Sequence, residues 1–105
     1  MAWTVVFHVA ALVEAEALSV DLRARLQRFT ELIALHGIAS LPPKAAKHLR
    51  EDLWELRITG RDGMARALYV TRSGQLLVIV HVFSKKTQKT PVRAIELALR
   101  RAEET

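Results

Sequence analysis

Residues 52–83 read DLWELRITGRDGMARALYVTRSGQLLVIVHVF. This stretch predicts three strands joined by two short turns, GRDG and RSGQ. The first strand alternates, so its apolar side chains point to one face while Glu55 and Arg57 point to the other. Turns this short connect neighbouring strands, which implies an antiparallel meander. The third strand, residues 76–83, is apolar on both faces and is therefore expected inside the sheet, covered on both sides.

The region before the meander predicts one strand and two helices. Residues 3–9, WTVVFHV, are rich in β-branched and aromatic side chains, which favours a strand. Residues 10–36 have a helical pattern, and Ser19 or Asp21 could cap the second helix. That helix has an apolar stripe at three- and four-residue steps, formed by Leu18, Leu22, Leu26, Phe29 and Ile33. The segment 38–48 contains two adjacent prolines and predicts a loop.

After the meander, Thr90 is expected to cap a final helix that has Pro91 at its first position. The apolar stripe of this helix consists of Ile95, Ala98, Leu99 and Ala102. The order is then β-α-α-β-β-β-α, an α+β fold with a four-stranded, mainly antiparallel sheet. A chain of 105 residues has room for one hydrophobic core, so residues 1–105 are expected to form a single domain.

The chain is basic, with a net charge of +5, and the charge is unevenly distributed. Residues 1–40 hold three basic and four acidic residues, whereas the remainder holds 13 basic and 7 acidic residues. This asymmetry favours a polyanionic partner, nucleic acid ahead of an anionic membrane. The absence of cysteine excludes disulfides and thiol catalysis and fits a reducing cytoplasm. Acidic residues interrupt the apolar N-terminal stretch, so we expect neither a signal peptide nor a membrane span.

No cofactor or metal is expected. The sequence contains no phosphate-binding glycine loop, nucleophile elbow or dinucleotide fingerprint. Its histidines are scattered and do not have the spacing of metal ligands, and the sequence has no cysteine that could supply a thiolate ligand.

A charged pair is predicted on the meander. Arg66 lies among apolar residues in ARAL, and a guanidinium that is even half buried needs an anionic partner. Glu55, on the neighbouring strand, could be that partner. The pair could serve catalysis, or it could be a cross-strand ion pair that only stabilises the sheet. The spacing alone leaves both interpretations open.

The last strand of the meander ends in a basic turn. Lys85 continues the strand face that carries His81, and Lys86 and Lys89 follow in the turn. The N-terminus of the final helix comes next, with its free N–H groups and the positive end of its dipole. Together these groups could bind a phosphate. Alternatively, the lysines form only a solvated turn, and His81 is a packed core histidine. Tyr69, one strand over, could stack on a base, donate a proton or only fill half-buried space.

Several short segments, in this order and spacing, resemble one known family. They are LHG at 35–37, Lys47 and Leu49 in a K-x-L pattern, LWELR at 53–57, RALYV at 66–70 and HVFSKKTQKTP at 81–91. With them the chain resembles the RelE/HigB-type toxins of bacterial type II toxin–antitoxin pairs, and in particular their small phage-related branch. The resemblance extends from about residue 18 to residue 103.

The resemblance implies the RelE fold, a twisted and mainly antiparallel four-stranded sheet packed on an N-terminal helical hairpin, with a C-terminal helix. It also implies an mRNA interferase, an endoribonuclease that cuts messenger RNA, usually on the ribosome, and so inhibits translation. The ribose 2′-hydroxyl would attack the adjacent phosphate, with no metal required. The implied partners are mRNA, the ribosome and a cognate antitoxin of helix-turn-helix type, encoded in the adjacent gene.

The resemblance also implies roles for individual residues. Arg66 would stabilise the transition state, assisted by Arg57 or by Lys85 and Lys86, and Glu55 would be the base or would orient Arg66. His81 has a suitable ordinary pKa for acid–base work. The expected RNA-binding residues are Lys47, Tyr69, Lys86 and Lys89. Several relatives have a Tyr or His near the C-terminus, whereas this chain ends RRAEET, so the general acid is unassigned.

Two other functions remain open at the level of the sequence. A relative without catalytic activity could bind RNA through the basic face. A ParE-like relative on the same fold could instead inhibit DNA gyrase, although only fold analogy supports that possibility.

Overall fold

A computed structural model describes residues 2–61, 63–85 and 89–105. Its elements are β1 (Thr4–Phe7), α1 (Val9–Glu16), α2 (Val20–His36), the short 3₁₀ helix η1 (Ile38–Ser40), β2 (Ala46–Arg50), β3 (Leu53–Gly60), β4 (Gly63–Arg72), β5 (Leu76–Lys85) and α3 (Val92–Ala102). Within these ranges, no helix has both the length and the apolar character needed to cross a membrane.

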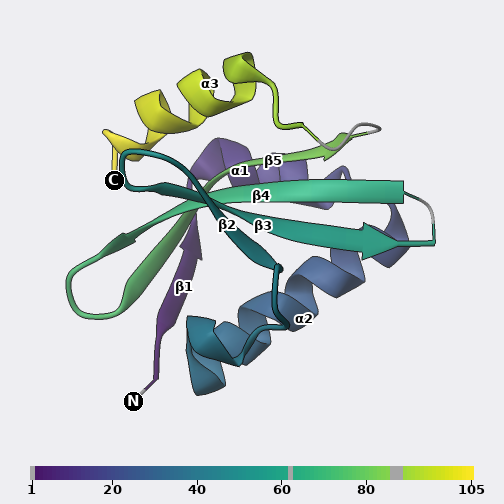
Figure 1. Cartoon of the computed structure of the whole chain (residues 1–105), viewed down its shortest axis with the longest axis horizontal. Coiled ribbons are helices and arrows are strands. Elements are labelled where there is room, and N and C mark those ends of the chain that lie inside the picture. Colours follow the sequence, from purple (N-terminus) through teal and green to yellow (C-terminus); the bar gives the residue numbers. More distant parts are fainter. Residues whose placement is uncertain (1, 62, 86–88) are drawn as a thin grey trace.

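The strands form one sheet in the order β1-β5-β4-β3-β2 (Figure 1). The neighbours β3, β4 and β5 pair antiparallel, which confirms the predicted meander. β1 pairs with β5 in parallel, with Thr4 opposite Leu76. β5 therefore lies inside the sheet between β1 and β4, as its apolar sequence predicts.

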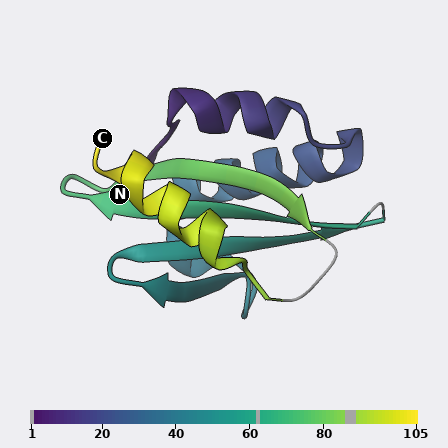
Figure 2. The ribbon, with the colours of Figure 1, turned by 90° about the horizontal axis from the view of Figure 1, so that it is seen from above.

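Helices cover both faces of the sheet. Figure 2 shows α3 in front of the strands, α2 behind them and α1 alongside β5, and residues of α1 and α2 share one core. On the α1/α2 side the core includes Leu22, Leu26 and Ile33 of the predicted helical stripe. On the α3 side the small residues Ala94, Ala98 and Ala102 bring the helix close to the sheet. The two faces of β3 differ in polarity. The apolar Leu56 points into the α1/α2 core, whereas the charged Glu55 points to the α3 side.

The sheet has five strands rather than the predicted four, because part of the predicted loop at 38–48 belongs to β2. Lys47 of β2 lies opposite Glu55, and His48 lies opposite Trp54. The carbonyl of Ala45 accepts a hydrogen bond of 2.7 Å from the N–H of Arg57. β2 is an edge strand with a mostly exposed, polar sequence. It therefore lacks the apolar alternation that identifies a strand, and pairing with β3 defines it instead.

The cap predicted for the second helix is present, whereas the cap predicted for the final helix is not. Ser19 caps α2 and accepts a hydrogen bond of 3.3 Å from the N–H of Leu22. Asp21, the other candidate, instead accepts the N–H of Arg61 at 2.7 Å. Thr90 was expected to cap α3, but that helix begins one residue later with no side-chain cap. The hydroxyl of Thr90 donates to Glu55 instead.

Glu14 joins three elements through one carboxylate oxygen. Its Oε1 accepts the N–H of Val82 at 3.0 Å, Nη1 of Arg101 at 2.9 Å, and pairs with Nδ1 of His81 at 2.9 Å. These contacts tie α1 and α3 to β5. Burial by itself raises the pKa of Glu14, but the bonds from Arg101, Val82 and His81 together hold that pKa below its ordinary value.

We expect Glu14→Gln to lower the free energy of unfolding at pH 7 by about 1–3 kcal/mol, because a charge-assisted bond and its neighbours are weakened. The pKa of Glu14 is lowered in the folded state, so its stabilisation is present above the unfolded value of 4.5 and is lost as the pH falls below it. Urea unfolding at several pH values measures this. The difference between wild type and variant should shrink in acid, and a difference independent of pH would contradict the assignment. Glu16→Gln, an exposed change on the same helix, is the control.

Tyr69 gives a second test of the core, at alkaline pH. Its side chain is 1% exposed in the α1/α2 core, and burial raises its pKa to about 12 from 10.0. Between these values the unfolded chain loses the phenolic proton before the folded one does, so stability falls as the pH rises. Unfolding of Tyr69→Phe and wild type should therefore diverge by about 1 kcal/mol more at pH 11 than at pH 8. Equal pH dependence of the two proteins would show that Tyr69 is accessible to solvent.

Candidate cationic site around Glu55

The sheet pairing gathers charged side chains on the α3 side of the sheet. Arg57 of β3 lies opposite Arg66 of β4, which lies opposite Phe83 of β5. Glu55 shares the face of Arg57, and Lys47 of β2 lies opposite Glu55. Lys85 follows Phe83 by two residues and so continues the same face at the end of β5. Four strands thus contribute to a single charged group.

Glu55 is the centre of this group. It is 1% exposed, and its Oε1 accepts a hydrogen bond of 3.2 Å from Nε of Arg57. Its Oε2 lies 3.6 Å from Nε of Arg66 and accepts the hydroxyl of Thr90. The predicted pairing of Glu55 with Arg66 is therefore present. Both carboxylate oxygens have donors, as a buried charge requires.

Arg66 is as deeply buried as its partner, with 1% exposure. Burial lowers its pKa, the charge of Glu55 acts in the opposite direction, and Arg57 lowers the pKa further. A guanidinium nevertheless stays protonated in proteins. Its Nη1 also donates to the carbonyl of Ala65 at 3.2 Å. Arg66 is therefore a cation held rigidly by the carboxylate and the backbone.

Lys85 is the least satisfied member of the group. Its Nζ is buried, and no hydrogen-bond partner for it is found among the residues that the structure describes. Burial lowers the pKa of Lys85, and the nearby charge of Arg66 is the next cause, with Glu55 opposing both. Arg57 and Lys47 lower it as well. The ammonium is thus crowded by other cations and releases its proton more readily than an ordinary lysine.

We define the cation cluster as Lys47, Arg57, Arg66 and Lys85. Among the described residues whose charges act on Lys85, Glu55 is the one carboxylate, so within this set one negative charge faces four positive ones. Such an excess attracts a further anion, because a ligand charge would relieve the repulsion among the four cations.

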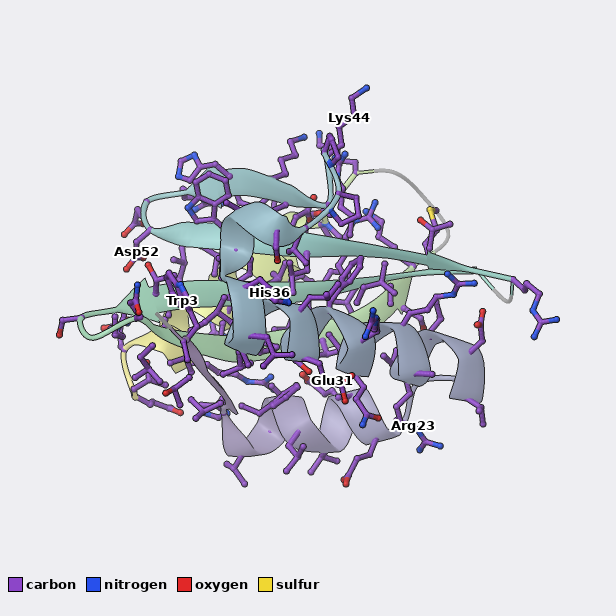
Figure 3. The ribbon with its side chains drawn as sticks, turned by 90° about the horizontal axis from the view of Figure 1, so that it is seen from below. Trp3, Arg23, Glu31, His36, Lys44 and Asp52 are labelled. Carbon is purple, nitrogen blue, oxygen red and sulfur yellow. The ribbon has the colours of Figure 1, made fainter. Side chains whose placement is uncertain are left out.

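Two cavities adjoin the cluster. One of about 450 Å³ is lined by Arg57, Arg66 and Lys44, among others, so it reaches Arg66 despite the low exposure of that residue. Figure 3 shows Lys44 extending away from the body of the protein. The other cavity, of about 210 Å³, is lined by Lys47, Glu55, Lys89 and neighbours at the start of α3. Between them the two cavities reach Lys47, Arg57 and Arg66 of the cluster.

Some expected site residues lie elsewhere. His81 stacks on Phe83, with ring centroids 4.9 Å apart, and its Nδ1 pairs with Glu14 rather than with Glu55. Tyr69 is buried on the opposite face of the sheet, so the structure does not bring it to the cluster. Lys86 lies outside the described residues.

Thr90 is a site residue that the sequence does not identify. Its place before Pro91 predicts a helix cap, and nothing in the sequence links it to a carboxylate 35 residues away. As for metals, His, Asp and Glu side chains in the described ranges form no group of three that could hold an ion.

Comparison with known proteins places the chain in a family. The family model described as Phage derived protein Gp49-like (DUF891) matches residues 14–103. A double arginine mutant of the E. coli toxin RelE in the free state matches with a TM-score of 0.65 and 17% identity, covering 96% of this chain and 98% of that one. The archaeal RelE–RelB complex from Pyrococcus horikoshii matches with a TM-score of 0.59 and 18% identity, covering 80% of this chain and 96% of that one.

A search of curated proteins gave no match. The structural matches share too little sequence to show more than the fold, but they agree with the family match, which covers most of the chain. Together they confirm the resemblance to RelE-like toxins that the sequence indicates. The chain belongs to the Gp49-like family, a family of RelE-like toxins, and has the RelE fold.

Proposed function

We propose that the protein is the toxin of a type II toxin–antitoxin pair and cleaves messenger RNA on the ribosome as an endoribonuclease. The observation that carries this proposal is the cation cluster around one buried carboxylate, beside a cavity of about 450 Å³. Membership of a RelE-like toxin family supports the same conclusion.

The reaction is a transesterification that needs no metal. The 2′-oxygen of a ribose forms a bond to the adjacent phosphorus, and the bond from that phosphorus to the 5′-oxygen of the next nucleotide breaks. The products are a 2′,3′-cyclic phosphate and a 5′-hydroxyl. The proton of the 2′-hydroxyl passes to solvent, and another proton must reach the departing 5′-oxygen. The transition state has two negative charges, which a cluster of cations stabilises more than it stabilises the ground state.

Arg57 and Arg66 supply that stabilisation. Both line the larger cavity, and their guanidinium groups offer several donors in a fixed plane that suits a phosphate. Glu55 orients them, since its two oxygens already accept donors from Arg57 and Thr90 and lie against Arg66. Of the two roles that the sequence left open for Glu55, base or orienter, these contacts support the second.

Lys85 delivers the proton to the departing 5′-oxygen. Its lowered pKa makes the ammonium a better acid than an ordinary lysine, and its Nζ is not committed to another described group. This assignment supplies the general acid that the C-terminal sequence leaves unassigned. Contacts with Glu14 hold His81 away from that role.

The RNA strand and the antitoxin complete the proposal. Lys47 and Lys89 line the smaller cavity and would bind backbone phosphates beside the scissile one, and Lys86, three residues before Lys89 in the sequence, would assist them. The P. horikoshii match is to a RelE–RelB complex, which supports an antitoxin partner for this chain too. As an enzyme that acts on mRNA, the protein would work in the cytoplasm.

A second candidate function follows from the burial of Glu55 and Arg66. With each 1% exposed, the two could be a structural ion pair while the exposed lysines Lys44, Lys47 and Lys89 bind RNA without cutting it. RNA affinity would then fall with salt, and no new 5′ ends would form.

The two functions are separated by Arg57→Ala and Arg66→Lys. For an endoribonuclease we expect each to slow cleavage by about 100-fold or more while the protein stays folded, because a transition-state donor is lost or displaced. Primer extension on mRNA bound to purified ribosomes measures the rate, and circular dichroism checks the fold. Arg28→Ala removes the same charge as Arg57→Ala but from the exposed face of α2, and it should cleave normally. Cleavage by both site variants at the wild-type rate would eliminate the arginines from the mechanism.

The role of Lys85 has its own test. Lys85→Met should slow cleavage of ordinary mRNA by about 100-fold or more, because the 5′-oxygen departs without a proton. A substrate with sulfur in place of that oxygen needs no proton, so the variant should cleave it at nearly the wild-type rate. Arg57→Ala should remain slow on both substrates. An equal defect of Lys85→Met on both would mean that Lys85 acts only through its charge.

A further inference from the structure

Thr90 occupies a position where its hydroxyl would ordinarily serve the helix that follows. A threonine before proline at a helix start commonly accepts a backbone N–H of the first turn. Here α3 begins at Val92, Pro91 is the N-cap and no side chain caps the helix. Thr90 is 8% exposed, and its hydroxyl donates to Oε2 of Glu55. The hydroxyl of Thr90 therefore binds Glu55, beside the cation cluster, instead of capping the helix.

The geometry at Glu55 shows what this bond does. Nε of Arg57 donates to Oε1, whereas Nε of Arg66 is 3.6 Å from Oε2, longer than a normal hydrogen bond. The hydroxyl of Thr90 donates the hydrogen bond to Oε2. A carboxylate bound on one oxygen can rotate about its terminal torsion, which is soft. A donor on each oxygen restricts that rotation and so determines where the two guanidinium groups can lie.

We propose that Thr90 is a positioning residue that acts through Glu55 on Arg57 and Arg66. Its hydroxyl holds the carboxylate in the orientation that directs both arginines to the phosphate, without touching the RNA itself. The link between this role and catalysis rests on the proposed function, whereas the positioning of the arginines does not. Small displacements of groups that stabilise a transition state reduce the rate much more than they reduce binding.

The test compares Thr90→Val, which keeps the shape and removes the donor, with Thr90→Ser, which keeps the donor. For Thr90→Val we expect kcat to fall by about tenfold with KM unchanged, and for Thr90→Ser we expect kcat within about twofold of wild type. Urea unfolding of both variants identifies the fraction folded. A wild-type kcat for Thr90→Val, or an equal loss in both variants, would overturn the proposal.

A second measurement does not depend on RNA cleavage. The Nε–H groups of Arg57 and Arg66 have their own signals in a ¹H–¹⁵N correlation spectrum, and Thr90→Val should shift the Arg57 signal while Thr90→Ser leaves it in place. An unchanged Arg57 signal in Thr90→Val would overturn the positioning role even if the rate falls. If the wild-type protein cleaves no RNA but the signal shifts as expected, the proposed function fails and the positioning of the arginines by Thr90 stands.

Discussion

The structure depends on a carboxylate, Glu55, placed beside Arg66 where water hardly reaches either of them. Removing a charge from water costs on the order of several kcal/mol per ion, so each of the two charges has to be paired and hydrogen-bonded. The sheet meets this requirement by supplying Arg57 from the same strand, and the segment before α3 supplies Thr90. The hydrogen bond from Thr90 to Glu55 therefore connects the meander to the segment that leads into the C-terminal helix. Because more cations than the pair needs surround it, the group has an excess of positive charge.

The protein contains a second carboxylate, the half-buried Glu14, that is held by several donors, and comparison of the two explains why Glu55 suggests a binding site and Glu14 does not. Glu14 receives a backbone N–H from β5 together with Arg101 and His81, and these donors satisfy it. Its surroundings hold the pKa of the carboxyl down and serve to join α1, β5 and α3. Around Glu55 the balance is different, since Lys85 has a lowered pKa and no described partner. Matched charges stabilise a fold, whereas an excess of one sign in a partly enclosed space favours a ligand of the other sign.

The low exposure of the cluster is itself consistent with a reaction at a phosphate. A cation in a site of low dielectric acts more strongly on a developing charge than the same cation in water. The cost is visible in the lowered pKa values of Arg66 and Lys85, which both arise first from burial. Arg66 is already held beside Glu55 and by the Ala65 carbonyl, so under the proposed function its guanidinium would need little reorganisation to meet a phosphate.

Strand alternation and helical periodicity are local properties, so the sequence predicts the meander and the stripe of α2. It left Glu55 as a candidate partner of Arg66, and the structure confirms that pair. The same alternation separates Tyr69 from Arg66, which lie an odd number of residues apart on β4 and therefore on opposite faces of the sheet. Only the tertiary structure decided that β2 is a strand, that His81 binds Glu14 and that Thr90 binds Glu55. Each of these depends on groups that are far apart in the chain, with partners 35 or 67 residues away for the two side chains, and no local pattern encodes such a distance.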